Sequence, residues 1–209
     1  MTIANDSVAI TPGSGATIAT HLVSSKEYQV MMLAQPNGQL LDELDSFVAS
    51  TGNTAHVAAA RTTLMDLFNA TGSGAIIKVR GLYLIPTLAA VTGVGITYEA
   101  IRTSAVGTGG TTVTPQSFDT SDPSLSANVT VRLKPTGGAT TAATLLFING
   151  TSEETIPYAS SASVTNHIPL GGTSYFKPIT LREGQGLKVD QTTNSAVGSV
   201  NVVLAFTVE

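Results

Sequence analysis

Residues 129–134 read VTVRLK, and in this stretch three aliphatic side chains alternate with three polar ones. Successive side chains of a β-strand point to opposite faces of a sheet, so such alternation sends one set to a core and the other to solvent. The stretch therefore predicts a β-strand with one buried and one exposed face.

Residues 200–208, VNVVLAFTV, repeat the pattern near the C-terminus, with a large apolar side chain at every second position. Val203 and Ala205 make the other face of this strand apolar as well. Strands that are buried on both faces carry such near-continuous apolar runs. We therefore expect a core strand that is central in its sheet or covered on both faces.

Further runs of β-branched and aliphatic residues are separated by clusters rich in glycine, proline, asparagine and serine. Many short strands with such connectors are typical of an antiparallel β-sandwich or jelly-roll-like domain. We place this mainly β domain at residues 71–209 and expect residues 104–123 to form an extended loop. The other predicted strands cover residues 16–23, 28–33, 75–84, 94–102, 144–149, 179–182 and 187–191.

Three short glycine-containing segments predict tight turns. Asn37-Gly38 predicts a turn, and Asn149-Gly150 suits a turn of type I′. Gly184-Gln185-Gly186 would connect the predicted strands on either side of it. We expect the second and third of these segments to close β-hairpins.

Residues 1–70 carry mixed signals and are expected to form an N-terminal arm followed by a mixed strand and helix region. Residues 54–69 contain neither glycine nor proline and predict a helix. The segment Thr11-Pro12-Gly13-Ser14-Gly15 predicts a flexible junction. We therefore expect residues 1 to about 25 to act as an extended interaction arm that is ordered by neighbouring molecules.

The composition excludes several kinds of chemistry. The 209 residues include no cysteine, which rules out disulfides, thiolate zinc sites, iron–sulfur clusters and a cysteine nucleophile. Only 11% of the residues are charged and the net charge is −4, so we expect neither nucleic acid nor an anionic membrane as a partner. A mean hydropathy of +0.24 argues for a folded chain.

Targeting and membrane-spanning segments are not expected. The opening residues, MTIANDSVAITPGSG, carry no basic leader and no apolar core of a signal peptide. The longest apolar stretch, residues 82–96, contains Pro86 and is shorter than the roughly 20 residues that cross a bilayer.

The histidines and the glycine-rich segments do not form recognisable motifs. His21, His56 and His167 are dispersed, and none has a second His or a carboxylate at the short spacings of a metal-ligand pair. Gly93-Val94-Gly95 lacks the third glycine of a dinucleotide fingerprint, and Gly72-Ser73-Gly74 lacks the Lys-Ser/Thr ending of a P-loop. We interpret the histidines as structural or surface residues and the glycines as turns or strand irregularities.

The acidic residues are likewise interpreted as structural or surface residues and not as functional sites. Glu153 and Glu154 are adjacent, which on a strand points them to opposite faces. The group Asp42, Glu43 and Asp45 lacks the EF-hand pattern and predicts a charged helix start or a loop.

Two further aspartates lie in the predicted loop. Asp119 and Asp122 suit caps of Asx-turns. We assign no catalytic, cofactor-binding or metal-binding residue, and we expect the protein not to be an enzyme.

Several turn and strand segments resemble those of structural proteins of tailed bacteriophages. At the front these are Pro12-Gly13-Ser14-Gly15, Ile18-Ala19-Thr20, Tyr28-Gln29-Val30 and Asn37-Gly38. In the centre they are Asn69, Gly72-Ser73-Gly74, Val79-Arg80, Arg102-Thr103-Ser104, Gly109-Gly110-Thr111 and the loop at 119–123. At the end they are residues 181–187, LREGQGL, with Gln191 and the strand at 200–208.

The resemblance implies a non-enzymatic virion protein, most specifically a capsid decoration or cement protein. Such a protein is made in the bacterial host cytoplasm and lies on the capsid surface. Its implied partners are the major capsid protein, further copies of itself as a homotrimer, and other virion proteins. A tail, neck or fibre-base component is the alternative.

A carbohydrate-binding or receptor-binding module is less favoured. Such a module would need an aromatic platform for stacking on sugars. The chain has no tryptophan, and among its tyrosines and phenylalanines only Tyr175 and Phe176 are adjacent.

Overall fold

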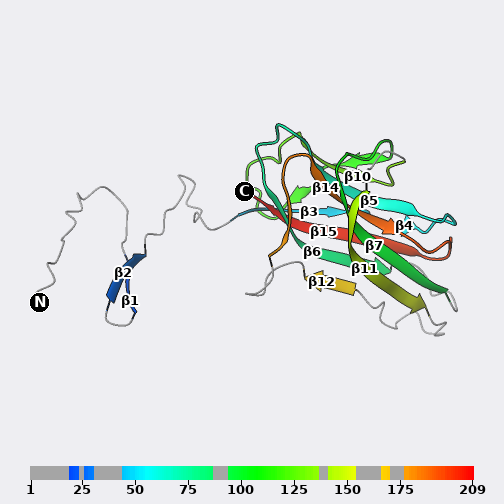
Figure 1. The fold of residues 1–209 in the computed structure, drawn as a ribbon, viewed down its shortest axis with the longest axis horizontal. Coiled ribbons are helices and arrows are strands. Elements are labelled where there is room, and N and C mark those ends of the chain that lie inside the picture. The colour runs from blue at the N-terminus through cyan, green and yellow to red at the C-terminus, as the bar shows by residue number, and fades with distance from the viewer. Residues whose placement is uncertain are drawn as a thin grey trace, which may run out of the picture. The chain divides into compact units, whose positions relative to one another are not determined.

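The computed structural model divides the chain into two compact units, residues 1–43 and residues 44–209. The structure describes residues 19–23, 26–30, 44–86, 94–136, 141–153, 166–169 and 177–209. In the first unit, β1 (Ala19–Val23) and β2 (Lys26–Val30) pair in antiparallel fashion (Figure 1). β1 lies within the strand predicted at residues 16–23, whereas β2 begins two residues before the strand predicted at residues 28–33 and overlaps it only in part.

The second unit is a sandwich of two antiparallel sheets, so the predicted fold class is confirmed. The six-stranded sheet has the order β11-β7-β14-β5-β10-β8 (Figure 1). Its strands are β5 (Thr62–Asn69), β7 (Val94–Thr103), β8 (Thr111–Val113), β10 (Val129–Leu133), β11 (Thr141–Glu153) and β14 (Gln185–Gln191).

The other sheet has the order β12-β6-β15-β3-β9, with β13 also paired to β6 and β4 to β15. Its longest strands, β6 and β15, lie at its centre. The strands are β3 (Asp45–Ser50), β4 (Thr54–Ala55), β6 (Ile77–Pro86), β9 (Gln116–Ser117), β12 (Asn166–Pro169), β13 (Ile179–Leu181) and β15 (Ser199–Val208).

The core lies between the two sheets. In the six-stranded sheet, Leu67 stands in register with Leu187 of β14 and Val131 of β10, and all three are buried. In the other sheet, Phe206 stacks on Phe47 with ring centroids 5.8 Å apart. Burying a side chain of this size contributes roughly 1.5–3 kcal/mol, so these rows supply much of the folding free energy.

The last strand has the position that its sequence predicts. β15 lies between β6 and β3, and its alternate residues from Val200 to Phe206 are almost fully buried. On its other face Val203 and Ala205 are half-buried. The strand is therefore central, while its second face is covered only in part.

The predicted helix at residues 54–69 is wrong, because this segment forms β4 and β5. Every residue from Leu64 to Asn69 is buried, since β5 lies between β14 and β10 in the middle of its sheet. Strand pairing with distant segments outweighs local helix preference here. The strands β3 to β5 thus belong to the sandwich, and the division of the chain lies after residue 43 rather than near residue 70.

Both predicted hairpins differ from the structure. β11 continues through Asn149-Gly150, and its register against β7 shifts between Asn149 and Ser152, so the pair forms a strand irregularity instead of a turn. The turn before Gln185 exists, with φ of +76° at Gly184. However, β13 pairs with β6 and β14 pairs with β5 and β7, so this turn connects the two sheets.

The segment predicted to be an extended loop, residues 104–123, contains two short strands. β8 adds to β10 at the edge of the six-stranded sheet, whereas β9 adds to β3 at the edge of the other. The chain between Val113 and Gln116 thus passes from one sheet to the other. The predicted turn at Asn37-Gly38 lies outside the described residues.

Replacing Phe206 with alanine tests the core. The ring is 1% exposed and stacks on Phe47, so Phe206→Ala should lower the free energy of unfolding by about 3–5 kcal/mol. Urea denaturation measures this change. The matched control is Phe118→Ala, which removes the same ring from a site that is 67% exposed and should change stability by less than about 0.5 kcal/mol. Equal effects of the two changes would contradict the core assignment.

Candidate functional site

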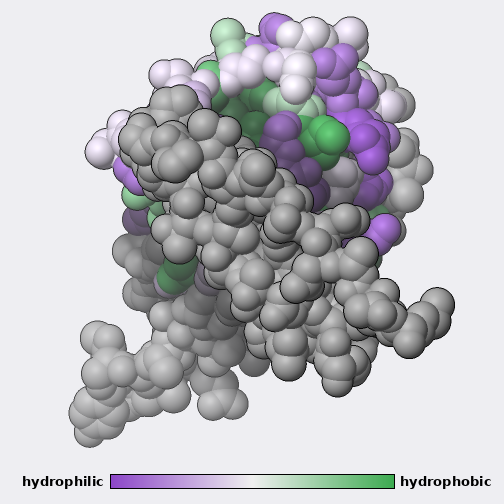
Figure 2. Space-filling view, turned by 90° about the vertical axis from the view of Figure 1, so that its left-hand side faces the viewer, coloured by the Kyte–Doolittle hydropathy of each residue, from purple (hydrophilic) through white to green (hydrophobic). Residues whose placement is uncertain are grey.

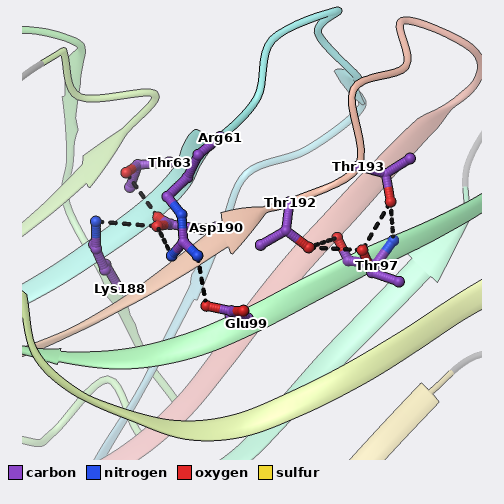
Figure 3. A network of polar contacts seen from close by, with 8 residues as sticks. All are labelled: Arg61, Thr63, Thr97, Glu99, Lys188, Asp190, Thr192 and Thr193. Atoms are coloured by element: carbon purple, nitrogen blue, oxygen red, sulfur yellow. Dashed lines mark hydrogen bonds and ion pairs between the residues drawn. The ribbon is translucent and has the colours of Figure 1, made fainter.

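The six-stranded sheet carries a group of buried charged residues on the face opposite its core. In β14, Leu187 and Val189 belong to the core, so Lys188 and Asp190 project from the other face of the sheet. Both are buried, as is Asp66 of the neighbouring strand β5. We call Arg61, Glu99, Lys188 and Asp190 the charged cluster. It is the most developed polar site among the described residues (Figure 3).

Asp190 is the centre of the charged cluster. Its side chain is 0% exposed, and its Oδ2 lies 3.2 Å from Arg61 Nη1 and 3.0 Å from Lys188 Nζ. Thr63 Oγ1 donates a hydrogen bond of 2.8 Å to Oδ1 of the same carboxylate. Arg61 Nη2 also contacts Glu99 Oε2 at 2.9 Å. These contacts compensate a buried negative charge and connect β5, β7 and β14.

Hydrogen bonds between threonine side chains connect β7 to the residues that follow β14 (Figure 3). The Oγ1 of Thr97 lies 2.6 Å from Thr192 Oγ1 and 2.8 Å from Thr193 Oγ1. The backbone N–H of Thr97 donates to Thr193 Oγ1 at 2.8 Å. The threonines therefore hold the first turn after β14 against β7.

Asp66 fixes the segment that follows β7. Its Oδ2 accepts a hydrogen bond of 2.7 Å from the backbone N–H of Gly107, while Oδ1 is buried with no hydrogen-bond partner among the described residues. Burial raises the pKa of Asp66, and the Gly107 N–H and the positive charges of Lys188 and Arg132 oppose that rise only in part. A Cβ at Gly107 would lie 2.8 Å from Pro135 Cβ, so the segment passes too close for a larger residue.

His56 and Gln191 connect loops to the sheets by hydrogen bonds. His56 Nδ1 lies 2.7 Å from the Val197 carbonyl oxygen, which can only accept, so Nδ1 carries the proton. Its Nε2 lies 2.8 Å from Tyr98 Oη. Both ring nitrogens of the buried His56 are therefore used for structure, as predicted. His21 lies in β1 and His167 in β12, and the side chains of both lie outside the described part.

Gln191 acts as a connector of the same kind. Its side chain is fully buried, and its Oε1 accepts from the N–H of Val57 at 3.1 Å. Its Nε2 lies within hydrogen-bond distance of the carbonyl oxygens of Val57, Thr193 and Ser195. The side chain thus joins the segment before β5 to the segment after β14.

The Gly72-Ser73-Gly74 segment is a turn, as predicted. Gly72 and Gly74 have φ of +83° and +69°, which favours glycine. The N–H of Gly74 donates to Glu183 Oε1 at 2.9 Å, and hydrogen bonds from Gly74 and Gly72 lower the pKa of Glu183. The turn therefore holds a carboxylate of its own chain. Gly95 lies in β7, and Gly93 is outside the described residues.

The loop aspartates cap a turn, as predicted. Asp119 Oδ1 accepts hydrogen bonds of 2.8 Å from both the N–H and the Oγ of Ser121. Asp122 Oδ2 accepts from Ser117 Oγ at 3.0 Å. Burial, followed by the negative charge of Asp122, raises the pKa of Asp45 at the start of β3.

The remaining candidate positions are only partly described. Glu153 ends β11, but its side chain is outside the described part. Asp42, Glu43, Glu154, Tyr175 and Phe176 lie outside the described residues altogether.

Sequence reasoning missed the charged cluster. Its strongest signal is Asp66, which interrupts the apolar run of β5, together with the charged pair Lys188 and Asp190 in β14. Arg61 and Asp190 are 129 residues apart, so no local spacing brings them together.

The comparisons with known proteins do not assign the chain to a family. No family model, curated protein or solved structure matches the chain. In the part of the chain that the structure describes, no three His, Asp or Glu side chains are grouped as metal ligands would be. The same part contains no helix of the length and apolar character needed to cross a membrane.

Replacing the central carboxylate tests whether the charged cluster supports the fold. Asp190→Asn leaves the buried ammonium of Lys188 without its counter-charge, and the free energy of unfolding should fall by about 3–5 kcal/mol. The matched control is Glu209→Gln, which breaks the more exposed pair with Lys78 and should cost no more than about 1 kcal/mol. Urea denaturation gives both values, and a loss at Asp190 no larger than that at Glu209 would refute the role of the cluster.

Asp66 should give stability a defined pH dependence. Because its folded-state pKa is raised above the ordinary value of 3.8, the folded protein binds a proton here more tightly than the unfolded chain does. The resulting stability is fully present below the ordinary pKa and is lost as the pH rises through the folded-state pKa. Asp66→Asn removes this titration, while its amide oxygen can still accept from Gly107.

The measurement is the free energy of unfolding of the wild type minus that of Asp66→Asn, from urea denaturation at about pH 4 and about pH 7. We expect this difference to be larger at the lower pH. A difference that is constant, or larger at the higher pH, would show that Asp66 has the opposite titration behaviour.

Proposed function

We propose that this chain is a non-enzymatic structural protein of a tailed-phage virion, specifically a decoration or cement protein that binds and stabilises the shell of major capsid protein. The observation that carries the proposal is the use of the buried polar groups. Asp190 forms ion pairs with Arg61 and Lys188, and His56 and Gln191 form hydrogen bonds to the backbone of loops. Side chains that could take part in chemistry here hold strands and loops in place.

The architecture supports a role based on lasting contacts. A sandwich whose strands are connected by ion pairs and hydrogen bonds offers surfaces that change little on binding. On the side of the molecule that Figure 2 shows, apolar residues lie between polar ones in the coloured part. Protein interfaces that form between folded subunits have such mixed surfaces.

The resemblance to phage structural proteins narrows the class of assembly. The segments that carry the resemblance include the Gly72-Ser73-Gly74 turn and residues 181–187. In the fold, a hydrogen bond from the N–H of Gly74 to Glu183 joins these two segments. The proposed partners are the major capsid protein, other virion proteins and further copies of this chain as a homotrimer on the capsid surface. The net charge of −4 favours protein over nucleic acid as the partner.

The test uses particles assembled with and without this protein. We expect purified particles to contain the chain, and shells assembled without it to disrupt at lower temperature. Adding the purified chain should restore the stability of those shells. Shells that already carry the protein serve as the control and should take up no more of it. Absence from particles would refute the proposal, and location in the tail would favour the tail, neck or fibre-base alternative.

A further inference from the structure

Phe118 is the most exposed of the large apolar side chains among the described residues. It follows β9 directly, at the edge of the five-strand row β12-β6-β15-β3-β9, and its ring is 67% exposed. Its backbone N–H donates to the Ser46 carbonyl oxygen at 2.9 Å, so the main chain is anchored to β3 while the ring faces solvent. Aromatic residues, phenylalanine among them, are enriched at protein interfaces.

The turn that carries Phe118 is already ordered by its own hydrogen bonds. Ser117 Oγ donates to the Asp119 carbonyl oxygen at 2.6 Å, and the Asp122 N–H donates to the same oxygen at 3.1 Å. Asp119 Oδ1 accepts twice from Ser121, and Asp122 Oδ2 lies 3.0 Å from the same Ser117 hydroxyl oxygen. Little conformational freedom of the backbone would be lost when a partner covers the ring.

The border of this surface is acidic. Asp119 lies next to Phe118, and Asp45 and Asp122 are close enough for the charge of Asp122 to affect Asp45. Hydrogen bonds from Ser121 lower the pKa of Asp119. Residues 44–50 and 114–123, which form β3, β9 and this turn, include no lysine or arginine.

We infer that Phe118 is the anchor by which this chain docks onto a different subunit of the particle, in an apolar pocket bordered by lysine or arginine side chains. The inference rests on the proposed function and adds the surface and the chemistry of the partner. An apolar centre with a charged rim matches the usual anatomy of an interface. A second copy docking through the same surface is disfavoured, because its aspartates would face these aspartates.

The chain offers a matched control for this surface. Leu145 of β11 is the other large apolar residue that is exposed among the described residues, at 37%, and it lies in the other sheet. Leu145→Ala thus removes exposed apolar area at a site remote from the turn in the fold. Asp119→Asn removes a rim charge while leaving an oxygen that can accept from Ser121.

The experiment measures binding of the purified full chain to shells assembled without it, by co-sedimentation at several salt concentrations. Phe118→Ala should weaken binding by at least about tenfold, with a melting temperature equal to that of the wild type. Leu145→Ala should bind like the wild type. Binding of the wild type should weaken as salt rises, and Asp119→Asn should bind with a smaller salt dependence.

The outcomes distinguish a failure of this inference from a failure of the proposed function. If the wild type binds and Phe118→Ala binds equally well, the anchor is wrong while the proposed function stands. If the wild type does not bind at all, both fail. If the wild type is an oligomer in solution that Phe118→Ala dissociates, the occupant is a second copy and the inferred partner is wrong.

Discussion

The register of β14 between β5 and β7 is the constraint on which both the core and the charged cluster depend. With Leu187 opposite Leu67, alternate residues of β14 enter the core while Lys188 and Asp190 project from the other face. A shift of β14 by one residue would send these two charged side chains into the core and Leu187 and Val189 out of it. Lys188 and Asp190 lie on the same strand, but the ion pair of Asp190 with Arg61 forms only in the correct register, so it adds specificity to a pairing that apolar burial alone would leave less defined.

The sequence was sufficient to predict strands that have one buried face, or that show a regular apolar period. Residues 129–134 and 200–208 are of this kind, and both are strands of the antiparallel sandwich. β5 was not recognisable in the same way, because its burial on both faces removes the alternation and leaves a run that a helix could also carry. Its assignment depends on β10 and β14, which lie far away in the sequence.

Local turn signals were less reliable than strand periodicity for a related reason. Asn149-Gly150 has the composition of a tight turn, yet pairing of β11 with β7 continues past it as an irregularity. At Gly184 the turn itself is present, but the sheets that accept the strands on either side are set by long-range pairing. The polar contacts follow the same rule, since Arg61, Glu99 and Asp190 meet only after three separate strands are in place.

Some of the few charged residues of this chain lie inside the fold, which leaves still fewer on its surface. Two of the few acidic residues, Asp66 and Asp190, are buried in the fold. Asp66 accepts a hydrogen bond from the N–H of Gly107, and Asp190 forms ion pairs with Arg61 and Lys188. Because Arg61 and Lys188 compensate the charge of Asp190, this carboxylate contributes little to the electrostatic field outside the molecule. Neutral hydroxyl and amide groups therefore make up much of the remaining polarity, and local groups such as the aspartates beside Phe118 stand out against them. A surface with few competing charges makes a small acidic rim effective in selecting a cationic partner.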